Sequence, residues 1–181
     1  MEQEPNKIEP EKSIENVDFK IVENSEKNKK VVMDLLHEYP NHFVPGLFEK
    51  SAEKDFEDSD IMIAYDGDTP IGCVMLHKVT REYNWMAVKR DTKIRRSEVA
   101  RRLFESFYPT IPPGTKLTAF PNTEDAFIPG HPSFSGKNFE AARKIYREMG
   151  WEMKEENRVE NKYGQGAHVY RVEWIPNKKT E

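Results

Sequence analysis

The segment 137–151, with the sequence KNFEAARKIYREMGW, constrains the fold more than any other part of the chain. Its apolar residues recur at helical spacing and give the expected helix one apolar face: Ala141, Ala142, Ile145 and Met149. Gly150 follows where a residue in the left-handed conformation ends a helix. An extended run begins at Trp151. The pattern predicts a core helix that stops at a glycine and packs on a sheet.

The composition of the chain narrows its class. The 181 residues are 33% charged and 36% hydrophobic, which suits one domain with its own core. A net charge of −4 gives no bulk electrostatic reason to expect a nucleic-acid partner. The one cysteine, Cys73, cannot form an internal disulfide and has no metal-ligand partners nearby in sequence. No segment resembles a signal peptide or a membrane span. We therefore expect a reduced, cytoplasmic protein without a metal or membrane partner.

Apolar periodicity between residues 17 and 175 predicts a single folded domain, with a mobile polar tail at 1–16 and a short tail at 176–181. The expected strands are 17–22, 60–65, 71–79, 83–88, 115–120, 151–159 and 167–174. Helices are expected after the cap at Asn24–Ser25, over 46–56, around Val99 to Phe107, and over 137–149. The element order is therefore β-α-α-β-β-β-α-β-α-β-β.

This order and the last helix together resemble the GCN5-related N-acetyltransferases (GNAT family). That family ends a helix with an alanine, a tyrosine one turn later and Gly-Phe after a further turn; the matching residues are Ala142, Tyr146, Gly150 and Trp151. The resemblance implies a single α/β (α+β) acyl-CoA acyltransferase fold, with a mixed central sheet of about seven strands and about four helices. It also implies that Tyr146 donates a proton to the leaving thiolate of coenzyme A. An ordinary core helix would show the same residues.

The resemblance places a pyrophosphate-binding turn before the third helix, where backbone N–H groups would point at acetyl-CoA. Arg95 fits the first position of the family motif and Ala100 the last, but Glu98 replaces a glycine. The implied cofactor contacts are Met86, Ala87, Val88, Arg95, Arg96, Ser97, Glu98, Val99, Ala100, Arg101 and Asn138. The arginines of this turn would offset the charge of Glu98. A solvated helix face or a nucleic-acid patch would have a similar composition.

The attacking amine must be neutral, so a base is useful. The resemblance makes Glu82, at the start of the fourth strand, the candidate base; a carboxylate in a hairpin turn is the alternative. His131, in a long aromatic loop, is a second candidate because histidine titrates near neutral pH; an exposed loop histidine without a catalytic role is the alternative. The segment 39–45 resembles a region that borders the acceptor site in the family; a rigid surface loop is the alternative.

The function implied is transfer of an acetyl group from acetyl-CoA to a primary amine of a small molecule or peptide by direct attack, in a monomer or homodimer. The alternative is a binding or regulatory module that has kept the fold and lost the cofactor.

Overall fold

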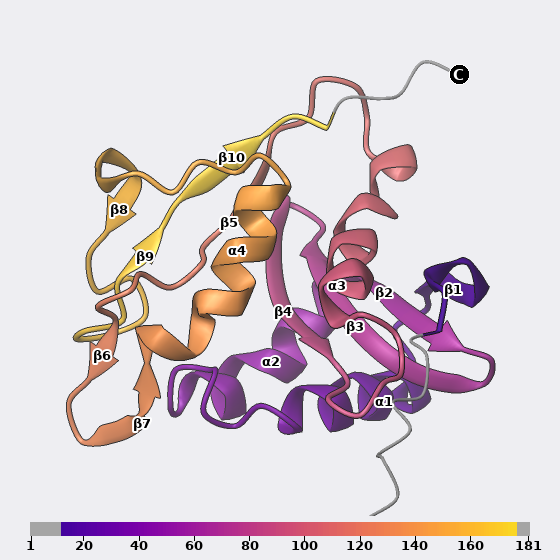
Figure 1. Cartoon of the computed structure of the whole chain (residues 1–181), viewed down its shortest axis with the longest axis horizontal. Helices are drawn as coiled ribbons and strands as arrows, with labels where there is room; N and C mark the ends of the chain where they lie inside the picture. Colours follow the sequence, from indigo (N-terminus) through magenta and orange to yellow (C-terminus); the bar gives the residue numbers. More distant parts are fainter. Residues whose placement is uncertain (1–11, 177–181) are drawn as a thin grey trace, which may run out of the picture.

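A six-stranded sheet forms the centre of the computed structural model, which describes residues 12–176 (Figure 1). Its order is β1-β2-β3-β4-β5-β10, and all neighbouring strands are antiparallel except β4 and β5. The strands are β1 (Val17–Val22), β2 (Ser59–Asp66), β3 (Thr69–His77), β4 (Glu82–Val88), β5 (Leu117–Ala119) and β10 (Val172–Trp174). The sheet is mixed, as the sequence predicted.

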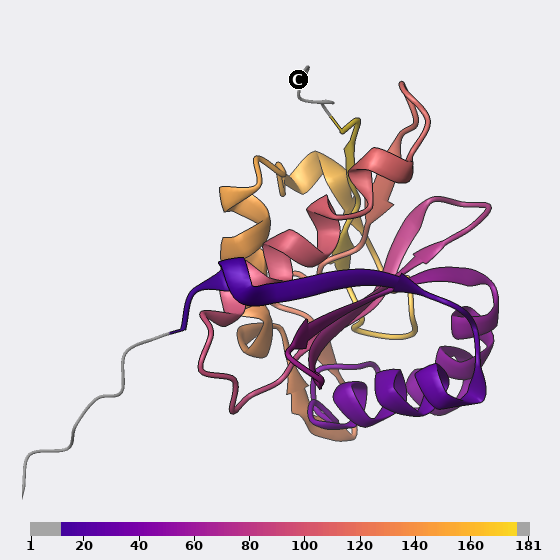
Figure 2. The same cartoon turned by 90° about the vertical axis from the view of Figure 1, so that its right-hand side faces the viewer.

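Four α-helices cover the two faces of this sheet (Figure 2): α1 (Glu26–His37), α2 (Leu47–Glu57), α3 (Arg96–Glu105) and α4 (Glu140–Glu148). Successive side chains of a strand point to opposite faces, and β2 follows this rule. Ile61 and Ile63 pack in the cluster with α1 and α2, whereas Met62 and Ala64 pack in the cluster with α3. Both layers of the core therefore rest on the same strands.

The expected cap at Ser25 starts α1, because the Ser25 hydroxyl accepts a hydrogen bond from the backbone N–H of Asn28. The buried face of α1 consists of Val32, Leu35 and Leu36. None of the helices within residues 12–176 is both long and apolar enough to cross a membrane.

The predicted strand at 151–159 is wrong over most of its length. A 3₁₀ turn occupies Glu155–Asn157, and only β8 (Arg158–Val159) is extended. Trp151 instead places its ring 3.9 Å from that of Trp174 and 4.8 Å from that of Tyr146, between centroids. The start of this segment therefore contributes Trp151 to an aromatic cluster and adds no strand to the central sheet. That sheet has six strands rather than about seven.

Two small hairpin sheets were not expected. β8 pairs with β9 (Val169–Tyr170), and Arg171 separates β9 from β10, so the predicted strand 167–174 is divided between two sheets. In the long link before α4, β6 (Phe127–Ile128) pairs with β7 (His131–Ser135).

The N-terminal boundary also differs from expectation. Lys12 forms an isolated bridge with Ile94, and Ile14 packs against the core. Residues 12–16 of the expected tail are therefore attached to the domain. The remainder of that tail and most of the C-terminal tail lie outside the described residues.

Candidate functional site

A cavity of about 990 Å³ opens where β4 and β5 diverge. These parallel strands pair at only two positions, Glu82 with Thr118 and Tyr83 with Ala119. Beyond Tyr83 the edge of β4 has no partner in β5. The cavity is lined by β4, by the start of α3, by α4 and by the segment from Tyr39 to α2. The gap between these two strands is the floor of a large site.

The turn before α3 forms one wall of this cavity. Four of the eleven predicted cofactor contacts line the cavity from this turn: Arg95, Arg96, Ser97 and Ala100. No side chain caps α3, and the N–H groups of Glu98 and Val99 turn back to the Arg95 carbonyl. Within residues 12–176 the N–H groups of Arg96 and Ser97 have no hydrogen-bond acceptor. A helix start of this kind attracts anions.

Three residues of the same turn lie away from the cavity. Glu98 is half-buried and does not line it, so its carboxylate is not in the wall where an anion would lie. Val99 is fully buried in the core. Arg101 points outward, where its guanidinium lies 3.8 Å from the Glu105 carboxylate. The replacement of the family glycine by Glu98 therefore does not block the cavity.

The backbone of β4 supplies the floor, and Met86, Ala87 and Val88 all line it. Trp85 adopts a φ of 40°, at the point where the register with β3 shifts between Val74 and Met75. Such a bulge bends a strand and turns its side chains. The Tyr39 hydroxyl donates a hydrogen bond to the Val88 carbonyl, which attaches the end of α1 to the end of β4.

Tyr146 lines the cavity from α4, and its ring is fixed on two sides. Its centroid lies 5.9 Å from that of Phe104 and 4.8 Å from that of Trp151. Burial raises the pKa of the Tyr146 phenol to about 12, so the hydroxyl remains protonated near neutral pH. Among the described residues the hydroxyl has no hydrogen-bond partner, which leaves its proton available to a molecule in the cavity.

The end of α4 confirms the predicted glycine stop. Gly150 has a φ of 82°, and its N–H donates to the Arg147 carbonyl at 3.0 Å. The Trp151 N–H donates to the Tyr146 carbonyl at 2.9 Å, which completes a Schellman motif. The motif turns Trp151 back onto the Tyr146 ring. The expected apolar face differs in part, because Ala141 and Ala142 line the cavity instead of packing on the sheet.

Glu82 also lines the cavity, at the end of the short β4–β5 pairing. Burial raises the pKa of its carboxyl above the usual 4.5, and the nearby Asp55 carboxylate acts in the same direction. Lys162, His77 and the Tyr163 hydroxyl oppose this shift. The Tyr163 hydroxyl is 3.5 Å from Glu82 Oε1. A carboxylate with a raised pKa and access to a cavity suits proton transfer.

Two other predicted residues lie in different surroundings. Asn138 lines the cavity, but its side-chain amide donates to the Ser133 carbonyl at 2.9 Å. His131 is exposed in β7 and does not line the cavity, so the structure does not bring it near Glu82 or Tyr146. From the segment 39–45, four residues do reach the cavity: Tyr39, His42, Phe43 and Val44.

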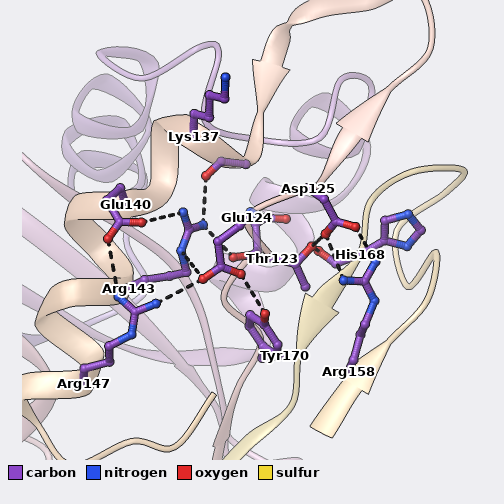
Figure 3. Close-up of polar contacts among 12 residues, drawn as sticks. Thr123, Glu124, Asp125, Lys137, Glu140, Arg143, Arg147, Arg158, His168 and Tyr170 are labelled. Carbon is purple, nitrogen blue, oxygen red and sulfur yellow. Dashed lines mark hydrogen bonds and ion pairs between the residues drawn. The ribbon is translucent and has the colours of Figure 1, made fainter. Parts of the chain in front are cut away.

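The sequence analysis missed a buried arginine that holds α4 in place. Arg143 is 1% exposed and donates hydrogen bonds to the carbonyls of Asn122 and Gly136, at 3.0 and 2.8 Å (Figure 3). Its other nitrogen atoms face Glu140 at 3.0 Å and Glu124 at 3.3 Å. An arginine within a charged helix carries no sequence signal for burial. Asp55 and Tyr163 were missed because they come from elements distant in sequence.

Comparison with solved structures identifies the fold. An acetyltransferase of the GNAT family from Desulfovibrio desulfuricans superposes with a TM-score of 0.62 at 15% identity, covering 88% of this chain and 98% of that one. An aminoglycoside 6'-N-acetyltransferase complexed with coenzyme A gives 0.60 at 13% identity, covering 90% and 99%. The ribosomal-protein alanine N-acetyltransferase from Escherichia coli gives 0.61 at 14% identity, covering 91% and 97%.

No family model matches the chain, and no curated protein matches its sequence. The structural likeness extends over almost the whole length of each neighbour, and the chain therefore has the GNAT fold that its last helix and element order predicted.

Proposed function

We propose that this chain, folded as a GNAT acyltransferase, transfers the acetyl group of acetyl-CoA to a primary amine by direct attack. The observation that carries the proposal is the single cavity that joins an uncapped helix start, the edge of β4 and the hydroxyl of Tyr146. A second observation is the solved neighbour that contains coenzyme A, which shows that this fold accommodates that molecule.

The wall at α3 would hold the pyrophosphate. Because α3 starts without a side-chain cap, the free N–H groups of Arg96 and Ser97 and the positive end of the helix dipole would face the anion. The side chains of Arg95 and Arg96 add positive charge. The unpaired edge of β4 would hydrogen-bond the pantetheine arm and direct an N–H at the thioester carbonyl, where negative charge develops. Acetyl-CoA supplies the activated acyl group in this arrangement.

Two side chains would then move protons. Glu82 accepts a proton from the acceptor ammonium, which gives the neutral amine needed for attack. The amine nitrogen bonds to the acetyl carbon as the carbon–sulfur bond breaks, and the electron pair of that bond leaves on sulfur. Tyr146 donates its hydroxyl proton to that thiolate, and the surplus proton on the product nitrogen then returns to the Tyr146 phenolate, which leaves a neutral amide. The raised pKa of Tyr146 keeps this proton in place until the thiolate forms.

One basis for the alternative, a binding module that has lost the cofactor, was the replacement of a family glycine by Glu98. Glu98 does not line the cavity, so it does not support that alternative. The acceptor is a small-molecule or peptide amine in this proposal, since the solved neighbours are named for both kinds of acceptor.

Calorimetric titration of acetyl-CoA into the purified chain tests the first half of this proposal, and thiol release with a panel of primary amines tests the second. We expect binding in the micromolar range and amine-dependent release of coenzyme A. Failure to bind at millimolar acetyl-CoA would overturn the proposal, and binding without release for any amine would reject transfer to amines.

A further inference from the structure

The charged residues of the cavity are segregated between its two ends. At one end they are Arg95 and Arg96, at the start of α3, with Lys144 and Glu148 on α4; at the other they are Asp55 on α2 and Glu82 on β4. The α3–α4 end therefore carries an excess of positive charge, as an anionic cofactor requires. The α2–β4 end has two carboxylates and no lysine or arginine in its lining.

Within residues 12–176 the two carboxylates have no ion-pair partner, although Lys162 and His77 act on Glu82 from outside the cavity lining. Asp55 accepts one hydrogen bond, from the Trp85 indole N–H at 2.6 Å, and Glu82 accepts one from Tyr163 at 3.5 Å. A carboxylate has about four acceptor positions, so both retain unused capacity. A partly buried carboxylate without an ion-pair partner is destabilising, and a bound cation would relieve that penalty.

The walls around these carboxylates are aromatic. Phe43 and Trp85 pack edge to face, with ring centroids 5.1 Å apart, and Tyr163 lies beside Glu82. Aromatic faces attract ammonium groups and pack against methylene chains. Leu47, Ser51 and Asp55 recur at four-residue intervals, so one stripe of α2 faces the cavity.

We propose that the acceptor is a small molecule with at least two ammonium groups, one deprotonated beside Glu82 for acetylation and the other held by Asp55 beside the Trp85 ring. This inference rests on the proposed function, because it assigns the substrate class of the same cavity. A monoamine would leave Asp55 without a counter-charge and would therefore be a poorer substrate.

Matched amines test the second charge. Butane-diamine is compared with butylamine and with aminobutanol, in which a hydroxyl replaces one amine. We expect kcat/KM for the diamine to exceed that of both analogues by about tenfold or more, because a hydrogen bond to a charged group contributes more than a neutral one. Kanamycin, with several ammonium groups on rings, distinguishes a cyclic from a linear acceptor. Equal kcat/KM values for the diamine and both analogues, without a preference for kanamycin, would overturn the proposal.

The Asp55→Asn variant assigns the effect to one carboxylate. Asparagine retains an oxygen acceptor for the Trp85 indole, so the wall keeps its shape. We expect the ratio of diamine to butylamine kcat/KM to fall about tenfold. Asp58→Asn, an exposed change at the end of the same helix, is the matched control and should leave that ratio at the wild-type value. A ratio unchanged in Asp55→Asn would reject the role of Asp55.

Calorimetric titration with butane-diamine separates this inference from the proposed function. One outcome is that the chain never releases coenzyme A but binds the diamine, more weakly in Asp55→Asn and equally well in Asp58→Asn. That outcome would reject acetyl transfer and support the cation site. Acetyl transfer to butylamine and aminobutanol as fast as to butane-diamine would support the transfer and reject the site.

Discussion

The packing around Tyr146 allows the role of its hydroxyl in the proposed chemistry to be tested by one substitution. Its ring is packed between Phe104 and Trp151, so removal of the hydroxyl leaves the packing intact. We expect Tyr146→Phe to lower kcat by at least about tenfold, as loss of a general acid does, and to change the acetyl-CoA dissociation constant by less than about twofold. Steady-state rates and calorimetry measure the two effects.

A matched control for this change is Tyr65→Phe, since Tyr65 is also a partly buried tyrosine but lies on β2, outside the cavity. That variant should turn over at the wild-type rate. If Tyr146→Phe and Tyr65→Phe behave alike, Tyr146 has only a packing role.

Glu82 couples the proposed chemistry to stability. Burial raises the pKa of its carboxyl in the folded chain above the ordinary 4.5 of the unfolded chain. The unfolded chain therefore loses this proton first, and the free energy of unfolding falls as the pH rises from about 4.5 through the raised pKa. We expect Glu82→Gln to be more stable than the wild type near neutral pH and equally stable below about pH 4. Urea denaturation at both pH values measures the difference.

The same variant should lose the acidic limb of the pH–rate profile, because that limb reports ionisation of the base. Glu53→Gln, an exposed glutamate on α2, provides the control for the stability measurement. A wild-type chain that is as stable as Glu82→Gln near neutral pH would contradict a desolvated carboxylate at this site.

Among the elements, α4 depends on one buried side chain for its position. The Arg143 guanidinium joins α4 to the carbonyls of Asn122 and Gly136, which belong to the link before the helix (Figure 3). A lysine has one ammonium and cannot reproduce this planar arrangement. We expect Arg143→Lys to lower the free energy of unfolding by about 2 kcal/mol, as measured by urea denaturation.

Arg147→Lys is the control for this change, because Arg147 lies one turn later on α4 and is 48% exposed on its side chain. Its ion pairs with Glu124 and Glu140 are at the surface, so the substitution should change the stability by less than about 0.5 kcal/mol. Equal effects of the two substitutions would show that Arg143 is not a structural anchor.

The sequence predicted those elements whose signals are local. The Schellman stop at Gly150 depends on a residue type and a helical phase, and α1 depends on the Ser25 cap and an apolar stripe. The segment after Trp151 was predicted as a strand because it follows a helix stop, but strand formation needs a partner. β5 is already paired on both edges, by β4 and β10, so this segment had no place beside it.

The candidate site shows the same division between local and distant signals. The turn at Arg95 to Ala100 was predicted because its residues are contiguous. The orientation of its side chains was not predicted, because the packing of α3 decides which of them face the cavity. Asp55 carries no mark in sequence that relates it to Glu82. Their proximity arises because α2 packs against the sheet that contains β4.

In the whole molecule, the N-terminal segment joins the first strand to the loop before α3. The Lys12 N–H donates to the Lys93 carbonyl at 3.0 Å, and the Lys12 ammonium lies 2.8 Å from Asp66. Lys93 and Ile94 belong to the loop that leads into α3. Loss of residues 12–16 would free this loop, and ordering each residue again on binding costs about 1–2 kcal/mol. We therefore expect a chain truncated before residue 17 to bind acetyl-CoA about tenfold more weakly than one truncated before residue 12. Calorimetric titration of both truncated chains measures the difference, and equal affinities would show that Ile94, which is buried in the core, holds the loop unaided.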